Sequence, residues 1–169
     1  MGVEEVINEL DRNGKVFVLL LNGLSLDVVT WKSKPEDWCI LEIVCHLVDE
    51  EKEDFRARVK LSLETPNGPL VPIAPEDWPR ERNYLGQDFK ESLERWERER
   101  LKSIAWLKAL PKVNWENAIN HPKFGRISAR SFLCNWLAHD YHHIRQINNL
   151  KYSYFKVKSG DSLSYAGNW

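Results

Sequence analysis

Cysteine is scarce in this chain, and its placement argues against a disulfide framework. The three cysteines are Cys39, Cys45 and Cys134, an odd number that cannot all pair, and none of them belongs to a Cys-x-x-Cys motif. Such usage is typical of a reducing compartment. We therefore interpret the cysteines as small apolar core residues of a cytoplasmic protein.

An excess of charge of one sign and long apolar runs are also lacking. The chain has 24 basic and 25 acidic residues, so it shows no basic footprint of a nucleic-acid binder. The longest apolar run, Val16 to Leu21, is far too short to span a bilayer, and the acidic first ten residues do not resemble a signal peptide. We expect a small-molecule partner, and neither nucleic acid nor a membrane.

The composition of the chain fits one domain, and its apolar pattern predicts that this domain is all-α. Its 169 residues are 43% hydrophobic and 29% charged, which fits a single domain over residues 1–169. Apolar residues recur at spacings of three and four, the pattern of amphipathic helices. The predicted helices cover about Val3 to Leu21, Trp38 to Leu63, a stretch capped by Asp88 that ends before Pro111, and Ser128 to Leu150. We expect the eight tryptophans mainly in the core and between helices.

The connections between these helices predict how the helices are arranged. The segment from Glu64 to Gln87 holds five of the eight prolines, a density that argues against a helix. In extended form it can travel the length of a helix, about 30–40 Å, and so join two parallel helices. A four-helix bundle with a long proline-rich crossover between its second and third helices follows. We expect a loop over Lys112 to Ile127, and an aromatic tail, residues 151–169, that packs on the bundle.

Two histidines, His139 and His143, lie four residues apart in an apolar stripe of the last helix. At about 100° per residue they share a face with Phe132 and Ile147. A buried imidazole needs a partner for each ring nitrogen, and a missing partner costs about 1–3 kcal/mol. One metal ion bound by both rings would supply partners. The alternative is a pair of ordinary core histidines, and a third ligand from elsewhere in the chain is needed to favour the metal.

Sequence offsets bring His46 and Glu50 to the level of this pair. If the second helix runs antiparallel to the last, His46 and His143 each lie about 10 Å from the same rim of the bundle. Glu50, one turn further along, then comes level with His139. The geometry predicts that three histidines meet near a rim, which suits an open catalytic site better than a closed structural one. The expectation fails if the two helices are parallel.

Arg100 is predicted in the centre of the apolar stripe of the third helix. A guanidinium at such a place needs carboxylate partners, and Glu50 and Asp140 are the candidates. The alternative is that the stem of Arg100 lies along the apolar face while its head reaches solvent.

Two stretches carry a resemblance to a known family. They are Trp38-x-x-x-Glu42-Ile43-x-x-His46-Leu47-x-Asp49-x-Glu51, and His121-Pro122-x-Phe124-Gly125-Arg126-Ile127-Ser128 followed by His139-Asp140-x-x-His143-Ile144-x-Gln146-Ile147. Both resemble the DinB-like superfamily, over about Val3 to Leu150. The resemblance implies an up-down-down-up four-helix bundle and a divalent metal held by His46, His139 and His143. The chain departs from the pattern at His142, which lies off the ligand face, and at Cys39, where the family often has a small hydroxyl residue.

The resemblance also implies chemistry of two kinds. Understood members include thiol-cofactor-dependent transferases and isomerases, and many others are described only as metal-dependent hydrolases without a known substrate. Three neutral imidazoles would leave a zinc or nickel ion with open positions, which can activate water or ionise a thiol. Glu50 is the expected base or support of His46, and Arg100 is expected either to bind a substrate carboxylate or to neutralise Glu50.

The sequence leaves two questions open. It does not distinguish a hydrolase that uses water from a transferase that uses a low-molecular-weight thiol. A second hypothesis is a non-catalytic, stress-related helical bundle that binds a metal or small ligand. In either case the tryptophan-rich helix faces suggest a homodimer.

Overall fold

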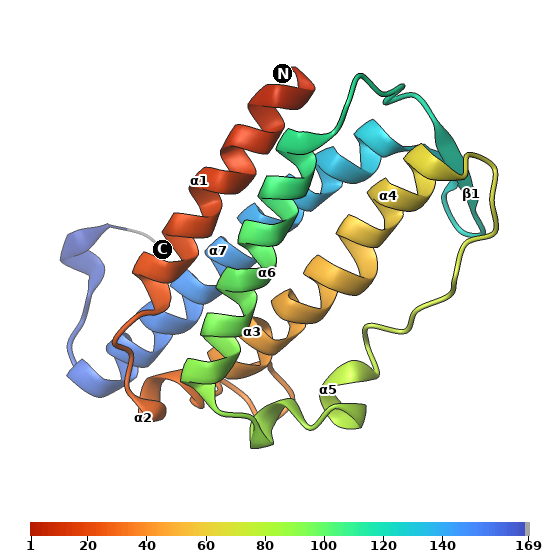
Figure 1. Ribbon diagram of the computed structural model, residues 1–169. Coiled ribbons are helices and arrows are strands. Elements are labelled where there is room, and N and C mark those ends of the chain that lie inside the picture. Colours follow the sequence, from red (N-terminus) through yellow and green to blue (C-terminus); the bar gives the residue numbers. More distant parts are fainter. Residues whose placement is uncertain (168–169) are drawn as a thin grey trace.

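Four long helical segments form the body of the molecule. The structure, a computed structural model, describes residues 1–167 (Figure 1). Its elements in chain order are α1 (Val3–Leu21), α2 (Leu26–Val29), α3 (Ile40–Asp49), the π-helical η1 (Glu50–Phe55), α4 (Arg56–Glu64), α5 (Trp78–Glu81), the 3-10 helix η2 (Tyr84–Gly86), α6 (Phe89–Ala109), β1 (Ala118–His121), β2 (Gly125–Ser128), α7 (Ala129–Ser159) and the 3-10 helix η3 (Ser164–Ala166). Because α3, η1 and α4 follow one another without a break, they make one continuous helical segment.

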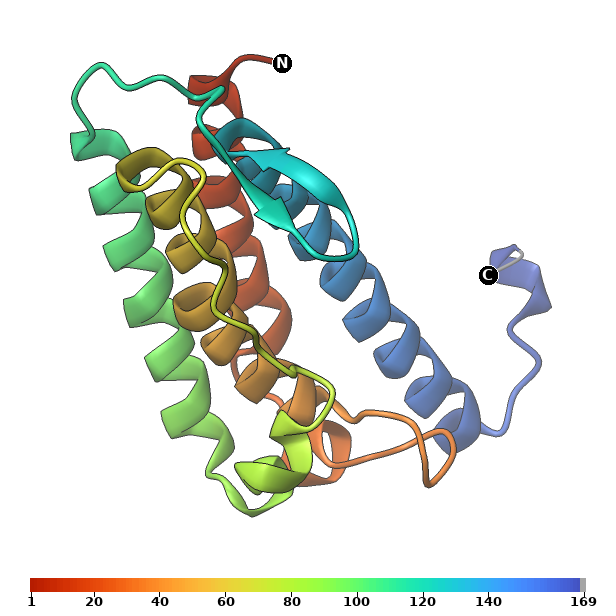
Figure 2. The same ribbon diagram turned by 90° about the vertical axis from the view of Figure 1, so that its right-hand side faces the viewer.

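The direction of each long helix decides which residues share a level. In Figure 1, α1 and α7 run downward, whereas the α3–η1–α4 segment and α6 run upward. The segment between α4 and α6 returns along the outside of the bundle in Figure 2. It contains the short helices α5 and η2, so the prediction that it holds no helix is wrong there. Pro79 lies in the first turn of α5, where the missing backbone N–H costs no hydrogen bond.

Local signals in the sequence fix several helix ends. The side chain of Asp88 accepts a hydrogen bond from the Glu91 backbone N–H at 2.9 Å and caps α6, as predicted. Ser128 caps α7 in the same way through the N–H of Ser131. The predicted end of α7 at Leu150 is wrong, because no helix breaker follows until Gly160. Gly160 ends the helix with a φ of 67°.

The core contains two large apolar clusters along the bundle. One gathers around Trp136 and Leu133 between α1, α4, α6 and α7, and the other gathers around Phe17 and Trp96. Phe17 and Trp96 meet edge to face, with ring centroids 4.9 Å apart.

The cysteines and tryptophans largely take the places expected for core residues. Cys39 and Cys45 are buried, Cys134 is half-buried, and all three are free thiols. Trp78, Trp96 and Trp136 lie in the core.

A β-hairpin replaces the predicted loop before α7. Strands β1 and β2 pair antiparallel, with Ala118 opposite Ser128 and His121 opposite Gly125. Gly125 adopts a φ of +70°, which favours glycine at the turn. The hairpin lies beside the end of α4 and the start of α7 (Figure 2), and Asn67 donates a backbone hydrogen bond to Ala118.

The predicted aromatic tail packs on the bundle only in part. Residues 151–159 continue α7, and the ring of Tyr154 contacts Trp31 at a centroid distance of 5.8 Å. Phe155 and Tyr165 are exposed, and residues 160–167 lead away from the helices in Figure 2. Residues 168 and 169 lie outside the described part of the chain.

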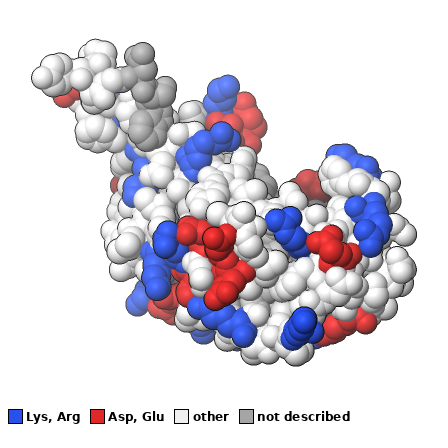
Figure 3. Space-filling model, turned by 90° about the horizontal axis from the view of Figure 1, so that it is seen from above, with Lys and Arg blue, Asp and Glu red and all other residues white. Residues whose placement is uncertain are grey.

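Two surface properties bear on partners. Acidic and basic side chains are interspersed over the face seen in Figure 3, in keeping with the net charge of −1. Within residues 1–167, each helix is too short or too polar to cross a membrane.

Candidate metal centre

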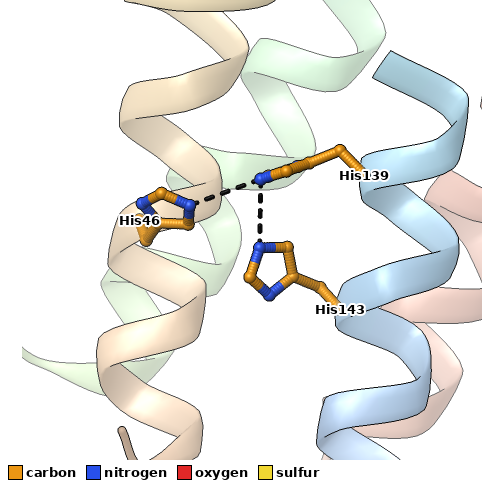
Figure 4. A group of neighbouring side chains, drawn as sticks. All are labelled: His46, His139 and His143. Carbon is orange, nitrogen blue, oxygen red and sulfur yellow. Dashed lines mark hydrogen bonds between the residues drawn. The ribbon is translucent and has the colours of Figure 1, made fainter. Parts of the chain in front are cut away.

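Three histidines converge between α3 and α7. His46 comes from α3, and His139 and His143 come from successive turns of α7 (Figure 4). The Nε2 atom of His139 lies 3.4 Å from Nε2 of His46 and 3.0 Å from Nε2 of His143. One nitrogen of each ring lies within 4.8 Å of the others. The structure therefore brings together the three residues that the sequence nominated as metal ligands.

The hydrogen-bonding of these rings fits a cation. Nδ1 of His143 lies 2.8 Å from the side-chain oxygen of Gln146, which can only accept, so the ring proton resides on Nδ1 and the lone pair on Nε2. His139 Nε2 faces two other Nε2 atoms, yet it carries either one proton or one lone pair and can satisfy only one of them. A divalent ion among the three nitrogens would use all three lone pairs.

The protonation states of the rings point the same way. Burial, together with the smaller effect of the neighbouring His143 imidazole, lowers the pKa of His46 to about 3 and that of His139 to about 2. Burial and nearby His142 lower the pKa of His143 to about 4. All three rings are therefore neutral near pH 7, the form in which imidazole binds metals.

The surroundings of the His46 ring show which of its nitrogens faces the proposed ion. The ring of Trp38 packs edge-on against it with centroids 4.9 Å apart. Its Nδ1 is buried and has no hydrogen-bond partner within residues 1–167. Glu50 Oε1 lies 3.9 Å from Nε2, on the ligand side of the ring. Glu50 thus faces the metal position and does not support His46 from behind.

Glu50 occupies the first position of the π-helical η1, which interrupts the predicted continuous α-helix from Trp38 to Leu63. Its side chain is buried, and burial together with the adjacent Asp54 carboxylate raises its pKa to about 8. A π-turn widens the helix locally and is frequent at functional sites. Both Glu50 and the next residue, Glu51, are buried in consequence. Sequence periodicity of 3.6 gives no signal for such a turn.

Arg100 is buried with carboxylate partners, as expected, and its head does not reach solvent. It donates from Nε and Nη2 to the carboxylate of Glu51, from Nη1 and Nη2 to Asp140, and from Nη1 to the carbonyl of Leu10. Asp140 was an expected partner, but Glu51 takes the place expected for Glu50. These bonds use all five guanidinium N–H groups in a side chain that is 3% exposed. None is left for a substrate carboxylate, so we assign Arg100 to holding α6, η1 and α7 together.

Glu51 is the residue that sequence reasoning missed. Besides Arg100, it accepts a hydrogen bond from the indole N–H of Trp136 at 3.0 Å. The available signal was the unpaired charge of Arg100 in an apolar stripe, which required two carboxylates. His142 lies off the ligand face as predicted, with its ring edge-on to His143 at 4.9 Å.

Two cavities reach the histidines. A cavity of about 500 Å³ is lined by the three histidines together with Glu36, Asp37, Trp38, His142 and Gln146. A larger one of about 750 Å³ extends from His139 and His142 toward the hairpin. Ile73 and Pro75 of the crossover form part of its wall. Trp78, which also belongs to the crossover, is buried against Cys45 and Tyr84 in a third apolar cluster.

Comparisons with known proteins agree with this architecture. The sequence profile of the DinB superfamily matches residues 9–147. A solved structure from Bacillus subtilis is similar in fold, with a TM-score of 0.78, 20% sequence identity, and coverage of 95% of this chain and 89% of that chain. That protein, YfiT, is described as "a probable metal-dependent hydrolase with an unusual four-helix bundle topology". No curated protein matches the chain in sequence.

Proposed function

Because this chain belongs to the DinB superfamily and presents three imidazole nitrogens to one point, we propose that it is a metal-dependent enzyme. The observation that carries the proposal is the hydrogen bond from His143 to Gln146, which leaves the Nε2 lone pair directed at the other two rings. A pair of ordinary core histidines would not need a third ring facing the same point.

His46, His139 and His143 would hold the ion. Zinc and nickel are the ions best suited to three neutral imidazoles, and three protein ligands leave coordination positions open. Such an ion supplies Lewis-acid chemistry, which polarises a substrate oxygen or lowers the pKa of water or of a thiol. Gln146 fixes the orientation of the His143 ring.

Glu50 is the residue that we propose for proton transfer. Its Oε1 atom lies beside His46 Nε2, at the edge of the ligand cluster, and its side chain is buried. In the ion-free protein its raised pKa keeps it protonated near pH 7. A cation nearby favours the carboxylate, which can then accept a proton from water or from a thiol and return it to a leaving group.

The nucleophile is water in a hydrolase and a low-molecular-weight thiol in a transferase. The description of YfiT supports the hydrolase form. We would assay the metal-loaded protein on ester and amide substrates without thiol, and separately on an electrophile with thiol. Turnover in either assay that requires both the ion and His139 supports the enzyme proposal. Full metal occupancy without ion-dependent turnover across both panels would favour the non-catalytic alternative.

A further inference from the structure

The larger cavity next to the histidine cluster is enclosed by four separate parts of the chain. It lies between α4, the crossover near Ile73, the β-hairpin and the start of α7, and it has a volume of about 750 Å³. His139 forms part of its lining, so the cavity ends at the candidate metal centre. Its size is that of a pocket for a small organic molecule.

Aromatic side chains provide much of its wall. Phe55, Phe124 and Phe132 line the cavity from η1, the hairpin turn and α7. The Phe55 ring also contacts the ring of His139, with centroids 4.9 Å apart. Phe124 is 66% exposed, so much of its side chain is open to a ligand. These surfaces fit a flat apolar or aromatic body better than a polar one.

Two arginines and one carboxylate give the cavity its charge. Arg58, Arg126 and Asp54 line it, and the Nε atom of Arg58 donates to Asp54 at 3.0 Å. Asp54 neutralises one arginine, so one positive charge remains for a ligand. The side chain of Arg126 has only a backbone carbonyl, that of Glu116, as its hydrogen-bond acceptor within residues 1–167.

Arg58 in this cavity and Arg100 near the histidine cluster differ in how many of their guanidinium N–H groups are hydrogen-bonded within the protein. Arg58 is 5% exposed, as deeply placed as Arg100. All five donors of Arg100 are used within the protein, whereas neither Nη atom of Arg58 has a hydrogen-bond partner within residues 1–167. Since Arg58 lines the cavity, its free donors are available to an anion there.

We propose that this cavity binds the substrate, and that the substrate is an organic monoanion with an aromatic or bulky apolar body. Its carboxylate binds Arg126 and the free Nη donors of Arg58, the body lies among the phenylalanine rings, and the reacting group points to His139. This proposal rests on the proposed function, because it assigns the substrate class of that site.

Calorimetric titration of the full chain with naphthoate tests the proposal. Naphthamide, which has nearly the same shape without charge, is the matched neutral ligand, and acetate is the matched anion without an apolar body. We expect naphthoate to bind at least about tenfold more tightly than either, the worth of one charge-assisted hydrogen bond. Equal binding of naphthoate and naphthamide, or absence of naphthoate binding, would overturn the proposal.

Substitutions locate the binding. Arg126→Gln should weaken naphthoate by about tenfold and leave naphthamide unchanged. The matched control is Arg130→Gln, since Arg130 is exposed and its side chain bonds only to the Met1 carbonyl within residues 1–167. Arg58→Lys should also weaken naphthoate, and thermal unfolding checks that it folds. Equal losses in the Arg126 and Arg130 variants would contradict the assigned site.

The same titrations distinguish this inference from the proposed function. They are repeated on His139→Ala/His143→Ala, with metal content measured on each sample. Arginine-dependent naphthoate binding in a wild-type protein that holds no metal would refute the metal-dependent function while supporting the anion cavity. Metal binding and turnover without any preference for naphthoate over naphthamide would support the metal-dependent function and refute the anion cavity.

Discussion

Arg100 on α6 and Asp140 on α7 form an ion pair through two hydrogen bonds, each with an N–O distance of 2.7 Å. Asp140 directly follows His139 in the sequence. Asp140 is 0% exposed, and the second carboxylate on Arg100, Glu51, is 2% exposed. The three charges therefore depend on one another, since each would be unpaired in the core without its partners. Their arrangement fixes the distance between the helices that carry the candidate ligands.

Removing the guanidinium group of Arg100 should destabilise the protein strongly. Arg100→Leu leaves two buried carboxylates without a counter-charge, and we expect the free energy of unfolding to fall by about 3–5 kcal/mol. Urea unfolding measures the loss. The control is Arg12→Leu, since Arg12 pairs with Glu9 at the surface, and its cost should be within about 0.5 kcal/mol. Similar losses for the two variants would show that the buried triad does not hold the helices together.

Replacing the hydrogen-bond acceptor of His143 should weaken metal binding. In Gln146→Leu the His143 ring loses the partner that fixes its proton on Nδ1, and we expect metal affinity to fall about 10–100-fold. Competition with a chromogenic chelator measures the affinity. Gln146→Glu keeps an acceptor and should retain most of the affinity. An unchanged affinity in Gln146→Leu would remove Gln146 from the site.

Glu50→Gln should reduce turnover without releasing the metal. The substitution keeps the shape of the side chain but removes its ability to exchange a proton, and we expect turnover to fall about 10²–10⁴-fold. The control is Glu53→Gln, which removes an exposed carboxylate paired with Arg82. If Glu50→Gln and Glu53→Gln are equally active on a substrate of the wild-type enzyme, Glu50 has no role in proton transfer.

The metal-free protein should lose stability in mild acid. The pKa values of His46 and His143 are lowered by burial to about 3 and 4 from an ordinary 6.5. Between pH 6.5 and 4 the unfolded chain therefore binds protons that the folded chain does not, so the free energy of unfolding falls as pH falls. Glu50 acts in the opposite sense, because its pKa is raised to about 8. Its contribution is present below pH 4.5 and is lost as pH rises toward 8.

The three histidines outnumber Glu50, so below pH 6.5 the loss of stability caused by the histidines should exceed the gain caused by Glu50. Chemical unfolding in the presence of a chelator at pH 6.5 and pH 4.5 measures it. His46→Leu should reduce the difference between the two values. A free energy of unfolding that is independent of pH in this range would contradict neutral burial of the cluster.

The sequence was sufficient for the parts of the site that depend on regular helix geometry. His139 and His143 could be placed on one face from the 3.6-residue period, and His46 could be added once helix direction was assumed. Asp88 was identified as a helix cap from side-chain chemistry. These features follow from local rules that hold throughout a helix.

Other features depend on contacts that periodicity does not describe. A π-turn spans Glu50–Phe55, and Glu51 rather than Glu50 reaches Arg100. The hairpin has strands of only four residues, too short for an alternating pattern to stand out. Trp78 lies in a proline-rich segment where no helix was predicted, but a short helix places its side chain in the core.

Elemental analysis of the untagged protein tests the central claim most directly. If His46, His139 and His143 hold an ion, the protein should contain close to one divalent metal per chain, and His142→Ala should retain it. His139→Ala/His143→Ala should contain none, because two of three ligands are removed. Metal at undiminished stoichiometry in that double variant would show that the ion binds elsewhere and would contradict the account.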